Sequence, residues 1–263
     1  MYQPRTYRHW VKDEGLVSFK VTVKETDLYL RAQKNLEQQA LKAIVKYRSS
    51  LEKYICEHPT FLTTLEPFSV AKDAPEMVME MAEAAQRVGV GPMAAVAGAI
   101  AERVGRELMK LSPEVIVENG GDIFMKTLTN RLVGVYAGNS PFTGKIALEV
   151  KPEETPLGIC TSSGTVGHSL SYGSADAVIV LSPSAALADA AATAIGNLIQ
   201  EAGDIPMGIE FAQDIAGLKG VLIIEGDKLG IWGEVKISSL DKGERFTYKD
   251  TITSEWSIGN SKC

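Results

Sequence analysis

The sequence contains little of what several common classes of protein require. Cys56, Cys160 and Cys263 are the three cysteines among 263 residues, too few and too irregularly spaced for a disulfide framework or a cysteine-based zinc site. Lysine and arginine are scattered, and the formal net charge is −6, which argues against the basic surface that binds a nucleic-acid backbone. We therefore expect reduced thiols and no nucleic-acid partner.

Long apolar runs are also missing. The N-terminus, MYQPRTYRHWVKDEG, has no apolar stretch before a small-residue cleavage site, so no secretory signal is expected. The most apolar region, 175–199, is interrupted by Asp176, Pro183 and Asp189, whereas a membrane-spanning helix needs about 20 apolar residues. We expect no membrane span and a cytoplasmic location.

What is present is a folded, core-forming composition, with 45% hydrophobic residues. Apolar residues that recur every three or four positions predict helices over 34–57, 73–88, 92–110 and 184–200. Short apolar runs bounded by glycine and proline predict strands over 16–23, 28–32, 115–118, 132–136, 146–150, 177–181, 220–225 and 229–233. Two rounds of helix followed by strands predict an α+β fold of two similar halves, without a residue-level repeat.

We predict a single domain over 1–263. Its N-terminal strand and helix portion is 1–72, its core is 73–235, and a polar C-terminal tail follows at 241–263. Small residues gather in 91–122, 161–178 and 187–197, and such bareness usually lets a backbone approach a ligand. The segment GVGPMA formally matches a dinucleotide fingerprint, but it follows a predicted helix instead of a strand, so we reject that interpretation.

The segment Asn119, Gly120, Gly121 and Asp122 follows an apolar strand and allows two interpretations. Its free amides could form an anion nest, and the asparagine or aspartate could hold a ribose, a ring or a metal. Asn-Gly between two apolar segments is equally a hairpin signal, with residues 123–125 as the return strand. The local sequence leaves both open.

A second polar loop contains Thr161, Ser162, Ser163 and Gly164, and is followed by His168. Hydroxyls, amides and an imidazole could grip a phosphate or run proton transfer. The lysine of a phosphate-binding Walker loop is missing, and such a segment is more often an ordinary loop.

Asp189 and Thr193 lie four residues apart on a predicted helix, so both could offer oxygen ligands to Mg²⁺. The simpler interpretation is that Asp189 caps the helix and Thr193 bonds to a carbonyl. Cys160 could be a nucleophile if a nearby cation lowered its pKa, although a buried thiol is the simpler interpretation. Asp176 is either in the same cleft as the histidine or a turn residue.

Taken in order, these segments resemble the ApbE flavin-transferase superfamily. ENGGD at 118–122 is similar to its N-x-GGD segment, and LADAAATAIGN at 187–197 is similar to its ADAL-x-TAL helix. The core similarity covers 85–203, and ETDLYLRA, VGPMAAVAG and TSSGTVGHSLSYGSADAV resemble a compact, largely uncharacterised cytosolic branch. Two departures stand out: Gly98 occupies the position of the transferases' lysine, and their H-x-x-DP-x-TG segment is shortened here to His168 and a Gly-Ser-Ala-Asp run.

The resemblance implies an ApbE-like fold of two halves around a central cleft. It implies Mg²⁺ bound by Asp189, Thr193 and the carbonyl of a residue near Ala95, with FAD or another phosphorylated small molecule as ligand. The activity implied is a metal-dependent transfer of FMN to a protein partner, with His168 as acid or base. Small-residue helices and an acidic surface suit a homo-oligomer. The alternatives are a non-flavin protein of sulfur or one-carbon metabolism that uses Cys160, or a homologue without catalysis.

Overall fold

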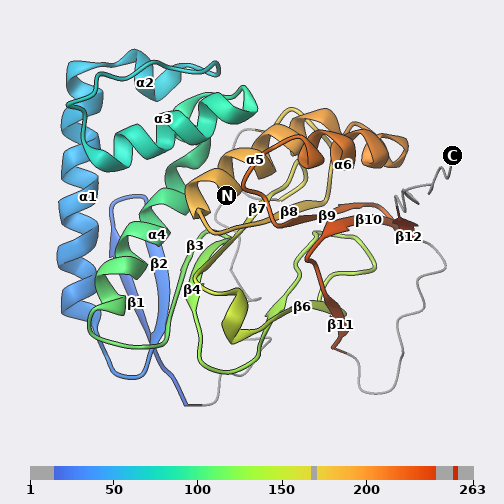
Figure 1. The fold of residues 1–263 in the computed structure, drawn as a ribbon, viewed down its shortest axis with the longest axis horizontal. Helices are drawn as coiled ribbons and strands as arrows, with labels where there is room; N and C mark the ends of the chain where they lie inside the picture. The colour runs from blue at the N-terminus through green and yellow to red at the C-terminus, as the bar shows by residue number, and fades with distance from the viewer. Residues whose placement is uncertain (1–14, 167–170, 241–250, 254–263) are drawn as a thin grey trace, which may run out of the picture.

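The computed structural model describes residues 15–166, 171–240 and 251–253 (Figure 1). The elements, in chain order, are β1 Val17–Val23, β2 Thr26–Ala32, α1 Glu37–Glu57, α2 Thr60–Thr63, α3 Glu76–Val88, the 3-10 helix η2 Pro92–Ala95, α4 Val96–Met109, β3 Val115–Asn119, β4 Asp122–Lys126, β5 Arg131–Gly134, β6 Ile146–Val150, η3 Pro152–Glu154, β7 Leu157–Ser162, β8 Ala177–Ser182, α5 Ala185–Leu198, η4 Ala202–Asp204, α6 Ile205–Gln213, β9 Gly220–Glu225, β10 Lys228–Gly233, β11 Ile237–Ser239 and β12 Thr251–Thr253.

The chain is built as two similar halves, as the order of predicted elements indicated. In the first half β1 and β2 pair, helices follow, and β3 and β4 pair; in the second half β7 and β8, then α5 and α6, then β9 and β10 repeat that order. Within each half the strand before the helices pairs antiparallel with the strand after them, β2 with β3 and β8 with β9. The halves join through β4 and β7 into one nine-stranded sheet. The fold is therefore α+β with a duplicated topology.

The sheet is covered on both faces. Helices α4, α5 and α6 pack on one face, and the three-stranded sheet of β5, β6 and β11 lies on the other side (Figure 1). Strand β8 shows why its sequence is apolar throughout: Val178 and Val180 belong to the core under the helices, whereas Ile179 and Leu181 belong to the core under the small sheet. A strand buried on both faces has no polar alternation.

Several boundaries differ from the sequence-based expectation. The helix expected at 92–110 is a 3-10 turn, Pro92–Ala95, followed by α4 from Val96. Helix α6 was missed, because Pro206 and Gly208 weaken the helical signal of a nine-residue segment. In the segment expected to be a polar tail, residues 251–253 form β12, which pairs parallel with β10.

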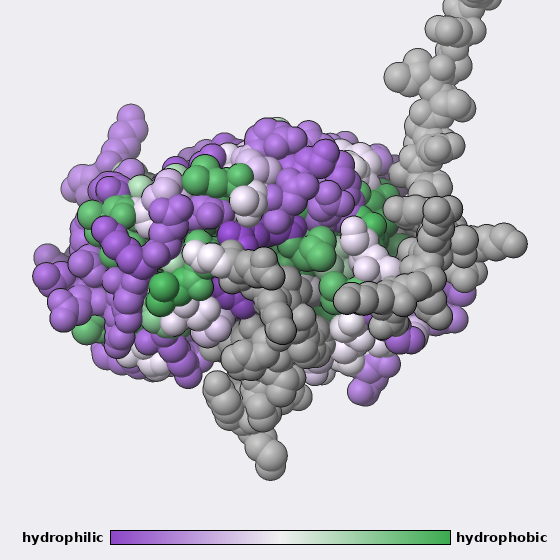
Figure 2. Space-filling view, turned by 90° about the horizontal axis from the view of Figure 1, so that it is seen from below, coloured by the Kyte–Doolittle hydropathy of each residue, from purple (hydrophilic) through white to green (hydrophobic). Residues whose placement is uncertain are grey.

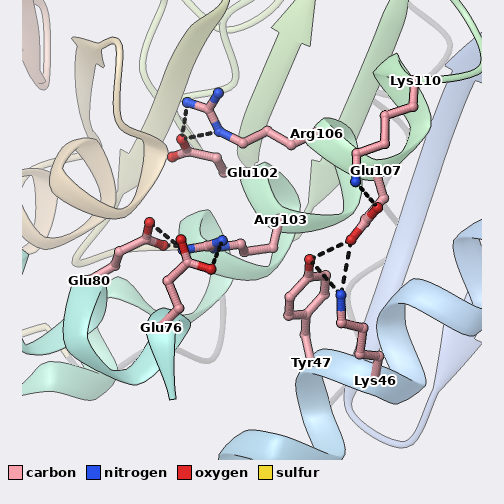
Figure 3. A network of polar contacts seen from close by, with 9 residues as sticks. All are labelled: Lys46, Tyr47, Glu76, Glu80, Glu102, Arg103, Arg106, Glu107 and Lys110. Atoms are coloured by element: carbon pink, nitrogen blue, oxygen red, sulfur yellow. Dashed lines mark hydrogen bonds and ion pairs between the residues drawn. The ribbon is translucent and has the colours of Figure 1, made fainter. Parts of the chain in front are cut away.

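Helix α4 is tied to its neighbours by charged side chains (Figure 3). Arg103 is buried and pairs with Glu76 of α3 at 2.8 Å. Glu107 accepts a hydrogen bond from the Tyr47 hydroxyl of α1 at 2.8 Å and pairs with Lys110. Hydrogen bonds from Lys110 and then Tyr47 lower the pKa of Glu107 to about 2. These contacts fix α4 against α1 and α3.

The small residues serve contacts between backbones. A Cβ on Gly98 would lie 2.2 Å from the carbonyl oxygen of Ala185, and one on Gly158 would lie 2.5 Å from the Cα of Ala185. A Cβ on Gly173 would lie 1.9 Å from the carbonyl oxygen of Gly196. At Gly98 and Gly173, which belong to the segments expected to approach a ligand, another segment of the chain fills that space instead.

The described part of the chain includes no helix of the length and apolarity that a bilayer crossing needs. On the face drawn in Figure 2, outside the grey atoms, hydrophobic residues form separate patches between hydrophilic ones. The homo-oligomer stays a prediction.

Candidate functional site

Three of the residues singled out from the sequence, Asp122, Cys160 and Asp189, meet where the two halves join. Strands β4 and β7 pair at this junction, and the N-terminal parts of α4 and α5 pack on each other next to it. Asp122 begins β4, Cys160 lies on β7, and Asp189 lies in the second turn of α5. Segments far apart in sequence thus form one polar cluster beneath two helix N-termini.

Helices α4 and α5 cap each other. The Oδ2 atom of Asp189 on α5 accepts a hydrogen bond of 2.8 Å from the amide of Gly98 in the first turn of α4. In return, Oε2 of Glu102 on α4 accepts one of 2.7 Å from the amide of Ala185, the first residue of α5. First-turn amides have no partner inside their own helix and carry a partial positive charge. The interpretation that Asp189 caps its own helix is therefore wrong: Ser184 caps α5 by accepting from the Leu187 amide at 3.3 Å, and Asp189 bonds the first turn of α4 instead.

Ionisation of the Asp189 carboxyl group is nevertheless unfavourable. Desolvation raises its pKa well above the usual value, and the negative charge of Asp122 raises it further, while the amides of Gly98 and Ala97 act in the opposite direction. Asp122 is buried and accepts a hydrogen bond of 3.1 Å from the amide of Thr161. Because the charge of Asp122 acts on Asp189 in a buried cluster, the two carboxyl groups cannot both ionise without cost.

One line of α5 is less deeply buried than the rest. Ten residues of this helix are buried, whereas Asp189, Thr193 and Asn197 are partly exposed, at a spacing of four. Residues four apart lie on one helix face. We call Asp189, Thr193 and Asn197 the α5 stripe; a carboxyl group and a hydroxyl lie next to each other on it.

The α5 stripe fits a hard divalent cation. Asp189 and Thr193 offer oxygen, which is what Mg²⁺ prefers, and the carbonyl of Ala95 lies in the turn that leads into α4. A carboxylate has about four acceptor positions, so two amide bonds leave room for a cation. Positive charge here would also relieve the repulsion between Asp189 and Asp122. Among the described residues no three His, Cys, Asp or Glu side chains converge on a point, so Thr193, the Ala95 carbonyl and ligand or water oxygens would complete the shell.

The Asn-Gly-Gly-Asp segment is a two-residue hairpin turn, with Asn119 opposite Asp122 and φ of 71° and 115° at Gly120 and Gly121. Two of its polar groups already have partners: Nδ2 of Asn119 donates to the carbonyl of Ala97 at 3.1 Å, and the backbone amide of Gly121 donates to Oε1 of Glu118 at 2.9 Å. The hairpin alternative is therefore the one that the structure contains. Asn119 fastens this turn to the start of α4.

Several polar groups of the serine-rich loop also form hydrogen bonds within the protein. Ser163 accepts hydrogen bonds from the amides of Thr165 and Val166, and the Gly164 amide donates to the carbonyl of Ala175. These amides are consequently not free for a phosphate. Ser162, the last residue of β7, is buried.

Asp176 joins two loops. It accepts hydrogen bonds from the Thr165 hydroxyl and from the Gly226 amide in the β9–β10 turn, both at 2.9 Å. Asp176 could have been a cleft residue or a turn residue, and these contacts are those of a turn residue. His168 lies outside the described residues, so its place in any cleft stays a prediction.

Cys160 is fully buried, and its thiol donates a hydrogen bond of 3.3 Å to the carbonyl of Ala185. Burial raises the pKa of the Cys160 thiol well above its usual value, and the negative charges of Asp122 and Asp189 add to the shift. A nucleophilic cysteine needs the opposite shift. The buried-thiol alternative matches this geometry.

The two cysteines that the structure describes should react very differently with an alkylating reagent. Cys56 is exposed and Cys160 is buried, and only a thiolate reacts. In the native protein at pH 8, iodoacetamide is expected to modify Cys56 within minutes and Cys160 only after denaturation. Peptide mapping by mass spectrometry measures both. Modification of Cys160 in the native protein at a rate near that of Cys56 would restore it as a reactive thiol.

Glu102 is a residue of this cluster that the sequence did not single out. It lies on α4 and bonds the amide of Ala185 at the start of α5, 83 residues further along the chain. Nothing in the local sequence pattern links residues so far apart. A glutamate on the otherwise buried face of a helix was the available signal, because buried carboxylates need partners.

The fold is that of the ApbE flavin transferases. With the apo flavinyl transferase ApbE of Pseudomonas stutzeri the TM-score is 0.56 at 14% identity, over 85% of this chain and 94% of that one. With a mutant form of the flavin transferase ApbE from Vibrio cholerae it is 0.52 at 14% identity, over 85% of this chain and 97% of that one.

The chain belongs to the family described as "AbpE bacteria", whose model matches residues 8–216. It is 44% identical to a UPF0280 protein of Methanococcus vannielii over 226 residues, which cover 84% of this chain and 92% of the relative. It is also 44% identical to a UPF0280 protein of Methanopyrus kandleri over 238 residues, with coverage of 87% and 95%. The chain is thus a member of an ApbE-like branch, as its motifs predicted.

Proposed function

We propose that this protein binds FAD together with Mg²⁺ at the junction of its two halves and transfers the FMN group to a protein hydroxyl. The observation that supports this most directly is the α5 stripe, where Asp189 and Thr193 are partly exposed on a helix that is otherwise mostly buried. The ApbE-like fold and the names of the solved relatives support the flavin.

Mg²⁺, when bound, would neutralise charge on the ligand's phosphates and on the departing phosphate. Asp189 and Thr193 would hold it, together with the Ala95 carbonyl. Gly98 has no side chain to offer a second cation in place of the transferases' lysine, and its amide is already bonded to Asp189. Neutralisation of the phosphate charge would therefore depend more on the metal than on residues of the chain.

The transfer itself needs a base. The oxygen of the accepting hydroxyl attacks the phosphorus of the FMN half, a new P–O bond forms, and the pyrophosphate bond breaks to release AMP. The hydroxyl proton passes to a base, for which His168 is our proposal. Asp176 would position the adjoining loop through Thr165. The buried, protonated Cys160 gives no support to the alternative in sulfur metabolism.

Thermal melting tests the proposed ligand. Purified protein is melted with FAD, FMN, ADP or ATP, each with and without MgCl₂, because a ligand that binds the native state raises its stability. At about 100 times Kd the gain is about 2.7 kcal/mol, or roughly 5–11 °C for a chain of this size. We expect this shift with FAD and Mg²⁺ together. No shift with any of the four nucleotides would refute the proposal.

A further inference from the structure

Tyr172 is the one exposed Phe, Tyr or Trp side chain in the described part of the chain, with 58% of its surface accessible. It lies on the loop that joins β7 to β8. An aromatic ring usually gains free energy by burial. An aromatic ring that is exposed to solvent is therefore a candidate surface for binding a partner.

The backbone around Tyr172 is fixed to the end of α5 and to the residues that follow it. Its amide donates to Oδ1 of Asn197 at 2.9 Å, and its carbonyl accepts from Nε2 of Gln200 at 2.9 Å. The next residue, Gly173, packs so closely on the carbonyl of Gly196 that a Cβ would lie 1.9 Å from it. The amide and the carbonyl of Tyr172 are therefore both hydrogen-bonded, and none of these contacts involves its ring.

These contacts place Tyr172 at one end of the α5 stripe. Asn197, which binds its amide, is the third member of the stripe, two helical turns beyond Asp189. Eight residues of α-helix rise about 12 Å. The proposed cation position and the backbone that carries the exposed ring therefore lie at opposite ends of one helix face. If the phosphates of a nucleotide lie at Asp189, its sugar and its ring can extend along that face.

We propose that Tyr172 is a stacking platform for the planar ring of the phosphorylated ligand, a role that rests on the proposed function. Base-to-aromatic stacking contributes about 1–3 kcal/mol, and tyrosine loses little conformational entropy when its backbone is already fixed. Asn197 is then a positioning residue that aligns the platform with Asp189. The ring bound is either the adenine or the isoalloxazine of FAD.

Affinities of FAD, FMN and ADP, each measured by calorimetry with MgCl₂, test this in wild type, Tyr172→Ala and Tyr172→Phe. Tyr172→Ala is expected to weaken FAD binding by about tenfold, which corresponds to about 1.4 kcal/mol, and Tyr172→Phe by less than about twofold because it keeps the ring. Leu128→Ala, at a residue 53% exposed, is the matched surface control. The variants should fold normally, since only backbone atoms of Tyr172 make the contacts described.

The ligand that loses affinity identifies the ring. A loss for ADP and FAD indicates adenine, and a loss for FMN and FAD indicates isoalloxazine; either supports the platform. Unchanged FAD affinity in Tyr172→Ala would overturn the platform and leave the FAD proposal intact. If wild type binds none of the three ligands, both proposals are wrong.

Discussion

Replacing Asp189 by asparagine is expected to have two effects of opposite sign. Without divalent cations at pH 8, the variant should melt above the wild type by roughly 2–4 °C, which is about 1 kcal/mol for a chain of this size. With FAD and Mg²⁺, the rise in melting temperature expected for the wild type should be absent from the variant. Asparagine keeps an oxygen for the Gly98 amide but has no charge to repel Asp122 or to attract a cation.

The pH dependence follows from the direction of the pKa shift. The pKa of Asp189 is raised in the folded protein, so the unfolded chain loses this proton first. The folded state is therefore penalised progressively as pH rises above the unfolded pKa of about 3.9, and the full penalty is present above the folded pKa. The advantage of Asp189→Asn should consequently shrink towards zero as pH falls to about 4.

Asp227→Asn is the matched control, because this side chain is 77% exposed. It should change neither the melting temperature nor the effect of FAD and Mg²⁺. If Asp189→Asn instead melts lower than the wild type at every pH, the carboxylate is chiefly a stabilising cap for α4. In that case the unfavourable proximity to Asp122 is not a property of the folded protein.

Gly98→Ala is expected to destabilise the protein although alanine favours helices. In a helix interior alanine gains about 1 kcal/mol over glycine. The added Cβ, however, would lie 2.2 Å from the carbonyl oxygen of Ala185 and 2.8 Å from the Cβ of Asp189. Overpacking against fixed atoms costs about 3 kcal/mol, so the net loss is about 2 kcal/mol, or roughly 4–8 °C in melting temperature.

Gly203→Ala separates this effect from a general cost of replacing glycine. The nearest atom to a Cβ there is Oε1 of Glu201 at 3.6 Å, an ordinary contact. Its melting temperature should stay within about 2 °C of the wild type. An unchanged melting temperature in Gly98→Ala would mean that α4 and α5 do not approach as closely as described.

The fold was largely predictable because its signals are local. Apolar periodicity identified α1, α3 and α5, and the Asn-Gly pair offered a hairpin at 119–122 as one of two alternatives, which the structure contains. The α+β class followed from the order of these elements. The duplicated topology was visible only in that order, because strand pairing depends on which faces are buried and not on matching residues.

The site was less predictable because its contacts join distant segments. Spacing alone paired Asp189 with Thr193, but the partners of Asp189 are the Gly98 amide on α4 and the charge of Asp122 on β4. The small residues around Gly98 suggested either tight packing of this helix or space for a ligand, and Gly98 is a point of tight packing, against α5. Contacts over such separations leave no periodic pattern in a single sequence.

A crystal structure with FAD and Mn²⁺ tests the central claim most directly, because manganese takes the oxygen ligands of Mg²⁺ and gives an anomalous signal. The account predicts an anomalous peak about 2.2 Å from oxygens of Asp189 and Thr193, next to the Ala95 carbonyl and bridged to a phosphate of FAD. FAD bound with the peak elsewhere, or with the Asp189 carboxylate bonded only to the α4 amides, would contradict it.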